Sequence, residues 1–141
     1  MTDATASSSP SPDPNSLRDL MPFTKTIGAT FSRYAKEEVK ARLDWAPEVC
    51  TAGGLLHGGA IMALADSSGA ACAFLNLPEG AQGTTTIESK TNFLRGLREG
   101  YVEATSRPLH VGRTVIVVET DVRDPQDRLV ARVLQTQLVL T

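Results

Sequence analysis

The spacing of apolar and polar positions predicts strands at both ends of the chain and one long helix between them. Over residues 27–45, apolar side chains such as Val39, Ala41 and Leu43 alternate with charged ones, which is typical of a pair of half-buried strands. The segment at about residues 58–75 is alanine-rich and apolar nearly all round. It therefore predicts a helix of roughly 27 Å that the rest of the protein encloses.

Four further strands are expected after this helix, because turn sequences divide the rest of the chain. The turns are "RGLREG", "HVGR" and "DPQDR", each with glycine or with proline and aspartate. The strands between them are expected at about residues 84–94, 100–110, 114–123 and 129–140. This order predicts an α+β domain in which a curved antiparallel sheet wraps around the central helix.

The first residues differ from the rest in composition. Residues 1–15 are mostly Ser, Thr, Pro and Asp, with almost no apolar side chains that could offset the entropy lost on ordering. They therefore predict a disordered tail before a domain over residues 16–141. A short helix is expected to begin at Asn15 or Ser16 and to end at Pro22.

Composition and charge narrow the classes of function. The 141 residues carry 14 basic and 16 acidic side chains, a net charge of −2, so we expect one domain and no nucleic-acid or membrane partner. The chain opens with no secretory signal, and Asp66 interrupts its longest apolar run, which favours a cytoplasmic protein. Cys50 and Cys72 lie in no metal-ligand spacing, so we expect reduced thiols and no metal site.

A carboxylate stands in the middle of the predicted apolar helix. Burying Asp66 costs several kcal/mol unless it is paired or hydrated. No basic residue stands three or four positions away, where the chain has Met62, Ala63, Gly69 and Ala70. Asp66 is therefore a candidate general base or nucleophile, and the structural alternative is a carboxylate bonded to the sheet backbone.

His57, Gly58 and Gly59 stand where the same helix is expected to begin. Backbone N–H groups at a helix N-terminus stabilise the negative charge that grows on a carbonyl oxygen during acyl transfer, and glycine lets a substrate approach them closely. Gly58 and Gly59 are therefore candidate oxyanion donors. His57 is a candidate for orienting the substrate, or for fixing the loop through a hydrogen bond to the backbone.

The stretch "HGGAIMALAD", with its acidic residue nine positions after the His, resembles the hotdog-fold acyl-CoA thioesterases of the phenylacetyl-CoA (PaaI) type. The stretches "TNFLRGLREGYVEA", "LHVGRT" and "DRLVAR" extend the resemblance over about residues 23–140. It implies a hotdog fold that hydrolyses an aryl- or medium-chain acyl-CoA to free acid and CoA. It also implies no metal or other cofactor, and a homodimer, often paired into a homotetramer, with sites between two protomers.

The resemblance also implies which residues act. It assigns catalytic roles to Asp66, Gly58, Gly59 and His57, with Gly59 preferred as the oxyanion donor. Many relatives carry an amide side chain six residues before the His, where this chain has Thr51, and the Thr51 hydroxyl is the candidate replacement. Candidate substrate-binding residues are Ser67, which follows the acid, and Thr86 on the first strand after the helix, as a residue that helps to hold water. For the CoA phosphates the candidates are Arg95, Arg98, His110, Arg113 and Thr114, which are expected to cluster in turns.

Helix geometry gives an independent argument for a site shared by two protomers. Asp66 and Gly59 share one face of the helix, but they lie about 10 Å apart along its axis, too far to touch one thioester. A second helix running antiparallel would place Asp66 of one protomer opposite Gly59 of the other. Met62, Phe74 and Phe93 are candidate lining residues of the acyl pocket.

Three other functions remain open at this point. The first is a dehydratase of 3-hydroxyacyl thioesters on a similar scaffold, which the His-Gly-Gly sequence disfavours. The second is a non-catalytic acyl-CoA-binding protein, and the third is a structural dimerisation module. Of these three functions, only the structural dimerisation module would leave Asp66 without a role.

Overall fold

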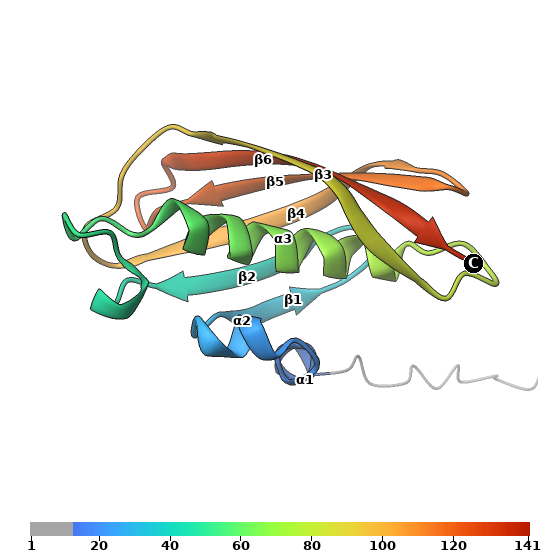
Figure 1. Cartoon of the computed structure of the whole chain (residues 1–141), viewed down its shortest axis with the longest axis horizontal. Helices are drawn as coiled ribbons and strands as arrows, with labels where there is room; N and C mark the ends of the chain where they lie inside the picture. The colour runs from blue at the N-terminus through green and yellow to red at the C-terminus, as the bar shows by residue number, and fades with distance from the viewer. Residues whose placement is uncertain (1–12) are drawn as a thin grey trace, which may run out of the picture.

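The computed structural model describes residues 13–141, so residues 1–12 of the predicted tail lie outside the described residues. The described chain begins with two short helices, α1 (Pro14–Leu20) and α2 (Pro22–Thr26), which lie below strand β1 in Figure 1. The first helix ends before Pro22, as predicted, but it begins at Pro14, so Pro14 and Asn15 belong to α1 and not to the predicted tail. A second helix begins at Pro22 because proline is favoured in the first turn.

The sheet has six strands, and every pair is antiparallel. The strands are β1 (Thr30–Tyr34), β2 (Val39–Asp44), β3 (Gly83–Phe93), β4 (Tyr101–Val111), β5 (Val115–Arg123) and β6 (Leu129–Leu140). Their order across the sheet is β1-β2-β4-β5-β6-β3, so β3 forms one edge. The four strands predicted after the helix are confirmed to within one residue at each end.

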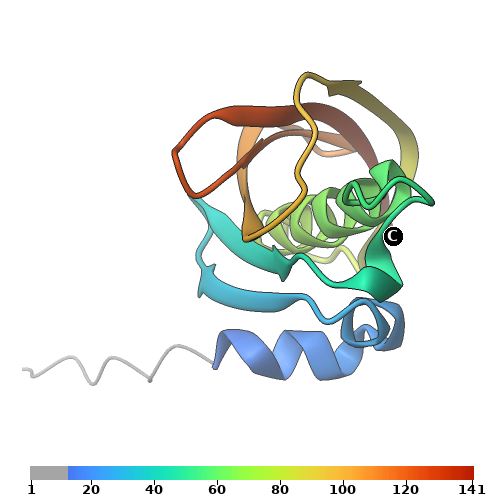
Figure 2. The same ribbon diagram turned by 90° about the vertical axis from the view of Figure 1, so that its left-hand side faces the viewer.

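Helix α3 (Gly58–Leu75) lies in the concave side of this sheet, which curves around it in Figure 2. Its buried residues, among them Ile61 and Leu64, pack against inward-facing side chains such as Val102 of β4 and Ile116 of β5. The predicted α+β hotdog architecture is therefore confirmed. The short 3-10 helix η1 (Pro47–Val49), which the sequence did not predict, lies in the segment that leads to α3.

A glycine in the middle of α3 marks a close approach between the helix and the sheet. Glycine inside a helix is about 1 kcal/mol less favourable than alanine. At Gly69, however, an added Cβ would lie only 2.1 Å from Oε1 of Gln135 on β6. The backbone of α3 can therefore approach β6 this closely only because residue 69 has no side chain.

The prediction that α3 is enclosed on all sides is wrong for the single protomer. Gly59, Met62, Asp66 and Phe74 form an exposed stripe along the helix. The sheet ends at β3 on this side, so no strand among residues 13–141 covers the stripe. By length and composition α3 would also qualify as a membrane span, but 44% of it is buried, as is typical of a core helix.

The two cysteines are free thiols, as predicted. Cys50 is half-buried, and Cys72 is buried in α3. Burial raises the pKa of the Cys72 thiol to about 11, so this group stays protonated near neutral pH.

Candidate active site

Asp66 lies on the exposed stripe of α3, opposite side chains of β3 and β6. Its Oδ1 accepts hydrogen bonds from Gln135 Nε2 at 2.8 Å and from Thr86 Oγ1 at 3.1 Å. No donor among residues 13–141 is bonded to Oδ2. The carboxylate is therefore held through one oxygen, while the other is open to a ligand.

Two residues of this site, Gln135 and Gln137, were missed in the sequence. Both side chains are at least 99% buried, on the inward face of β6 between Val133 and Val139. Gln137 Nε2 donates to Thr86 Oγ1 at 2.6 Å. The sequence contained one signal for these residues, because two amide side chains stand two positions apart in a predicted strand. The alternation of apolar and polar residues alone, however, did not tell which face of β6 points inward.

Ser67 follows Asp66 but faces a different neighbour. Its hydroxyl forms a hydrogen bond of 2.9 Å with the hydroxyl of Thr24, a buried residue of α2. Ser67 therefore ties α3 to the N-terminal helices, and no hydrogen bond to the Asp66 carboxylate is found.

The N-terminus of α3 is capped by the residue before it. His57 is the N-cap residue, and its Nδ1 accepts a hydrogen bond of 2.8 Å from the Gly59 N–H. Since Nδ1 is the acceptor, a neutral His57 ring carries its proton on Nε2. The Gly58 N–H has no acceptor among the described residues, so Gly58, rather than the preferred Gly59, has the backbone amide open to a ligand.

A cleft of about 390 Å³ lies beside this helix end and brings together three predicted site residues, Thr51, Gly58 and Arg95. Phe93 also lines it, and its ring lies 3.2 Å from the position that a Cβ on Gly58 would take. The cleft therefore joins the open amide, a hydroxyl, a guanidinium and an aromatic ring.

The predicted cluster of phosphate-binding residues is not formed within one protomer. Arg95 lines the cleft at the N-terminal end of α3, and Arg98 donates to the carbonyl of Gly53 at 2.8 Å. His110, Arg113 and Thr114 lie instead around the turn that follows β4. The two groups precede and follow an 11-residue strand, so they stand at opposite ends of the sheet (Figure 1), about 33 Å apart along β4.

A second cleft, of about 310 Å³, is mostly apolar, and its nearest residue on α3 lies one helical turn after Asp66. Ala70 and Phe74 on α3 follow Asp66 by one and two helical turns, and Thr84 lies two residues before Thr86 on the same face of β3. The full lining is Leu20, Met21, Tyr34, Ala70, Ala71, Phe74, Gly83 and Thr84. Of the three predicted acyl-pocket residues, Phe74 lies here, Phe93 lines the first cleft and Met62 lies on the exposed stripe.

Tyr34 is the one phenol in this apolar lining, and its surroundings disfavour ionisation. Burial, and then the neighbouring Cys72 thiol group, raise the pKa of Tyr34 above its ordinary value. Near neutral pH this side chain therefore presents a neutral ring and hydroxyl to the cleft.

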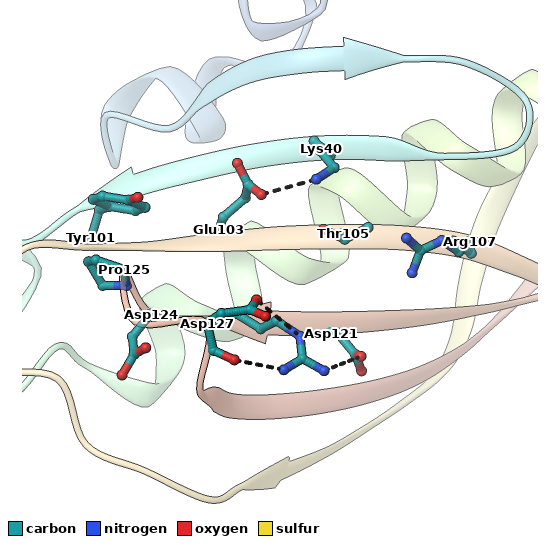
Figure 3. A pocket seen from close by; sticks show the side chains of 10 residues that line it. Lys40, Tyr101, Glu103, Thr105, Arg107, Asp121, Asp124, Pro125 and Asp127 are labelled. Atoms are coloured by element: carbon teal, nitrogen blue, oxygen red, sulfur yellow. Dashed lines mark hydrogen bonds and ion pairs between the residues drawn. The ribbon is translucent and has the colours of Figure 1, made fainter.

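A third cleft, of about 340 Å³, lies on the outer face of the sheet, away from α3 (Figure 3). Its charges are largely neutralised by each other: Lys40 pairs with Glu103 at 3.3 Å, and Arg123 pairs with Asp121 at 3.3 Å and with Asp127 at 3.9 Å. None of the predicted site residues lines this cleft. It is therefore an ion-paired surface separate from the Asp66 site.

The part of the chain that the structure describes contains no group of three or more His, Cys, Asp or Glu side chains arranged to hold a metal ion. Asp66 is surrounded by a hydroxyl and by amide side chains, whereas the open backbone amide and the imidazole lie at the N-terminus of α3.

Comparison with known proteins identifies the family and agrees with the fold. Residues 53–131 match the model of the thioesterase superfamily. The Mycobacterium tuberculosis protein Rv1847 is 32% identical over 87% of this chain and 90% of its own length. The 1,4-dihydroxy-2-naphthoyl-CoA hydrolase of Escherichia coli is 40% identical over 54% of this chain and 55% of its own.

Among solved structures, a variant of thioesterase PA1618 from Pseudomonas aeruginosa matches with a TM-score of 0.86 and 28% identity, covering 92% of this chain and 95% of that one. The chain therefore belongs to the thioesterase superfamily and is a thioester hydrolase. The resemblance found in "HGGAIMALAD" is thus confirmed.

Proposed function

We propose that this member of the thioesterase superfamily hydrolyses an apolar acyl-CoA to the free acid and CoA, with Asp66 as the catalytic carboxylate. The observation that carries the proposal is the setting of Asp66. Its Oδ1 is held by two donors, its Oδ2 is open, and an apolar cleft begins one helical turn away. This combination suits a carboxylate that acts on the carbonyl of a bound acyl group.

The complete site is proposed to form between two protomers. Asp66 lies eight residues after Gly58, about 12 Å along α3, so one protomer cannot bring both to the same thioester. The exposed stripe of α3 and the exposed side chains Ile87 and Phe93 of the edge strand β3 supply an uncovered apolar face for a second copy. An antiparallel partner helix would place Gly58 of the other protomer opposite Asp66. Pairing of such dimers into a homotetramer remains a prediction.

The reaction then follows from the groups on the two helices. The Gly58 N–H, supported by the positive end of the α3 dipole, stabilises the negative charge on the thioester oxygen, and His57 Nε2–H can orient the same group. Asp66 Oδ2 either takes a proton from water, which attacks the carbonyl carbon, or attacks that carbon itself to form an anhydride that water then opens. In both routes the C–S bond breaks and the CoA thiolate leaves and is protonated. A reaction without a metal or other cofactor remains a prediction.

The apolar cleft is proposed to take the acyl group. Its lining has no carboxylate, ammonium or guanidinium group, which excludes the CoA phosphates and favours an aromatic ring or a medium-length alkyl chain. The E. coli relative named as a naphthoyl-CoA hydrolase supports an aromatic acyl group among these.

The CoA moiety is proposed to extend from the thioester toward the solvent. If two protomers pair with antiparallel α3 helices, Arg95 of one protomer would approach Asp66 of the other, because Arg95 lines the cleft at the N-terminal end of α3. Arg95 is therefore the first candidate for a phosphate contact. Thr51, which lines the same cleft, supplies a hydroxyl near the open amide. Ser67, His110, Arg113 and Thr114 remain predicted substrate-binding residues, and the cytoplasmic location remains a prediction.

Release of free thiol from a panel of aryl- and alkyl-CoA esters tests the proposal. We expect the wild type to hydrolyse at least one ester, and Asp66→Asn, with the wild-type circular dichroism spectrum, to lose at least about 100-fold in kcat. Binding of acyl-CoA without thiol release by the wild type would favour the acyl-CoA-binding protein. Loss of water from a 3-hydroxyacyl-CoA would favour the dehydratase.

A further inference from the structure

Two buried amide side chains contact the Asp66–Thr86 pair from the sheet. Gln135 and Gln137 occupy inward positions of β6. Other buried positions of this strand hold valine, as at Val130, Val133 and Val139. A buried amide is unfavourable unless it is hydrogen-bonded. Gln135 Nε2 donates to Asp66 Oδ1 and, over longer distances, to the Asp66 carbonyl and to Thr86 Oγ1. Gln137 reaches Asp66 only through Thr86.

The hydrogen-bond directions in this group follow from the chemistry of its members. An ionised carboxylate only accepts, so Gln135 must turn its NH₂ group toward Asp66 Oδ1. Gln137 Nε2 only donates, so Thr86 Oγ1 accepts from it at 2.6 Å and keeps its single proton for Asp66 Oδ1. Gln135 Nε2 also donates to Thr86 Oγ1, at 3.3 Å. The direction in which the Thr86 hydroxyl donates is therefore set by both amides, and mainly by Gln137 through its shorter bond.

Gln135 holds this orientation although one of its atoms has no partner. With Nε2 bonded to Asp66, Gln135 Oε1 is buried against Gly69 and has no hydrogen-bond donor among the described residues. An unpaired buried oxygen is unfavourable, and the glycine that makes room for it weakens the helix. An apolar side chain at position 135 would avoid both effects, so a structural role alone does not account for the amide.

We propose, on the basis of the function proposed above, that Gln135 and Gln137 are positioning residues that fix Asp66 Oδ1 and thereby present Oδ2 to the thioester. Two donors converge on one oxygen, which fixes the rotation of the carboxylate and leaves the other oxygen on the exposed side. Neither amide lines the acyl cleft, so each is proposed to act through Asp66 and not through substrate affinity.

The test uses the best acyl-CoA substrate of the full-length wild type and measures kcat, KM and melting temperature. Gln135→Met keeps the length of the side chain but removes the donor. We expect kcat to fall about 10-fold to 100-fold, the range for loss of a hydrogen bond to a charged group, with KM within about 2-fold. The matched control is Thr120→Val, which removes a buried hydroxyl bonded to Ser106 at 2.7 Å in a separate group and should leave kcat within about 2-fold.

A double-mutant cycle covers the case in which Gln135→Met does not fold. Gln137 is proposed to act only through Thr86, so Gln137→Met should lower kcat in wild type but have almost no further effect in a Thr86→Val background. Independent, multiplying effects would overturn the proposal, as would a Gln135→Met variant that folds and keeps the wild-type kcat. If the wild type hydrolyses no thioester, the proposed function itself fails, and that outcome is distinct from both of these.

Discussion

Mixing two inactive variants gives a quantitative test of the shared site. Gly58→Pro removes the open N–H and is compatible with the helix, because proline is well tolerated at the first helical position. The Phe93 ring, 3.2 Å from the new Cβ, must shift slightly to admit it, so the circular dichroism spectrum and melting temperature of the variant are measured first. Loss of one oxyanion donor lowers kcat about 100-fold to 1,000-fold. Asp66→Asn removes the carboxylate charge. Each variant alone is therefore expected to be nearly inactive, for a different reason.

The expected recovery follows from how the two helices are paired. In a mixed dimer, one site combines both substitutions, while the other combines the intact Asp66 with the intact Gly58. Equimolar random pairing makes half of the dimers mixed, each with one intact site of two, so activity should return to about one quarter of the wild-type value. Differently tagged protomers and native mass spectrometry verify the exchange. Background activity after verified exchange would refute the reasoning, because the Asp66 and Gly58 of one site would then belong to one chain.

Two further predictions concern the acyl cleft and the response to acid. Thr84→Leu should narrow the cleft and lower kcat/KM for aryl- and medium-chain acyl-CoA at least 10-fold, while acetyl-CoA hydrolysis is kept. Thr85→Leu, on the opposite face of β3, is the matched control. Equal chain-length profiles for the two variants would contradict the assignment of this cleft to the acyl group. Asp124 at the β5–β6 turn is buried, which raises its pKa, but hydrogen bonds from Arg128 and Gln126 outweigh burial and hold the pKa below its ordinary value of 3.8. Its stabilising contribution is then present above pH 3.8 and is lost as pH falls through the lower folded-state pKa, so between pH 5 and pH 2 the melting temperature of wild type should fall more steeply than that of Asp124→Asn. Parallel melting curves would show that this carboxylate does not contribute.

Local signals in the sequence predicted most of the fold. Strand alternation, the turn sequences and the uninterrupted apolar segment each depend on neighbouring residues, so the boundaries of α3 and of the last four strands could be predicted closely. The second helix at Pro22 was not predicted, because proline ends one helix and begins another equally well.

The candidate site could be predicted only in part, because part of it depends on contacts distant in sequence. The spacing in "HGGAIMALAD" identified Asp66 and the helix N-terminus, since all of these residues belong to one helix. Gln135 lies 69 residues from Asp66, and its role becomes visible only when β6 is placed beside α3. Likewise, Arg95 and Arg113 were expected to cluster because both lie in turns, but turns at opposite ends of a strand cannot meet within one protomer.

The exposed stripe of α3 shows the same limit in physical terms. The apolar pattern predicted that something covers the helix on every side, and this is consistent with a second copy of the chain. Sequence periodicity does not distinguish burial within a chain from burial between chains. The exposed position of Asp66 therefore emerged only with the three-dimensional structure.

The most direct measurement is a crystal structure with an acyl-CoA analogue in which a methylene group replaces the thioester sulfur, so that the carbonyl is kept but cannot be hydrolysed. The account predicts the carbonyl oxygen at about 2.7–3.1 Å from the Gly58 N of one protomer, with Asp66 Oδ2 of the other protomer facing the carbonyl carbon and the acyl group in the cleft beside Ala70 and Phe74. A carbonyl bound away from both Gly58 and Asp66, or an acyl group on the ion-paired outer face of the sheet, would contradict it.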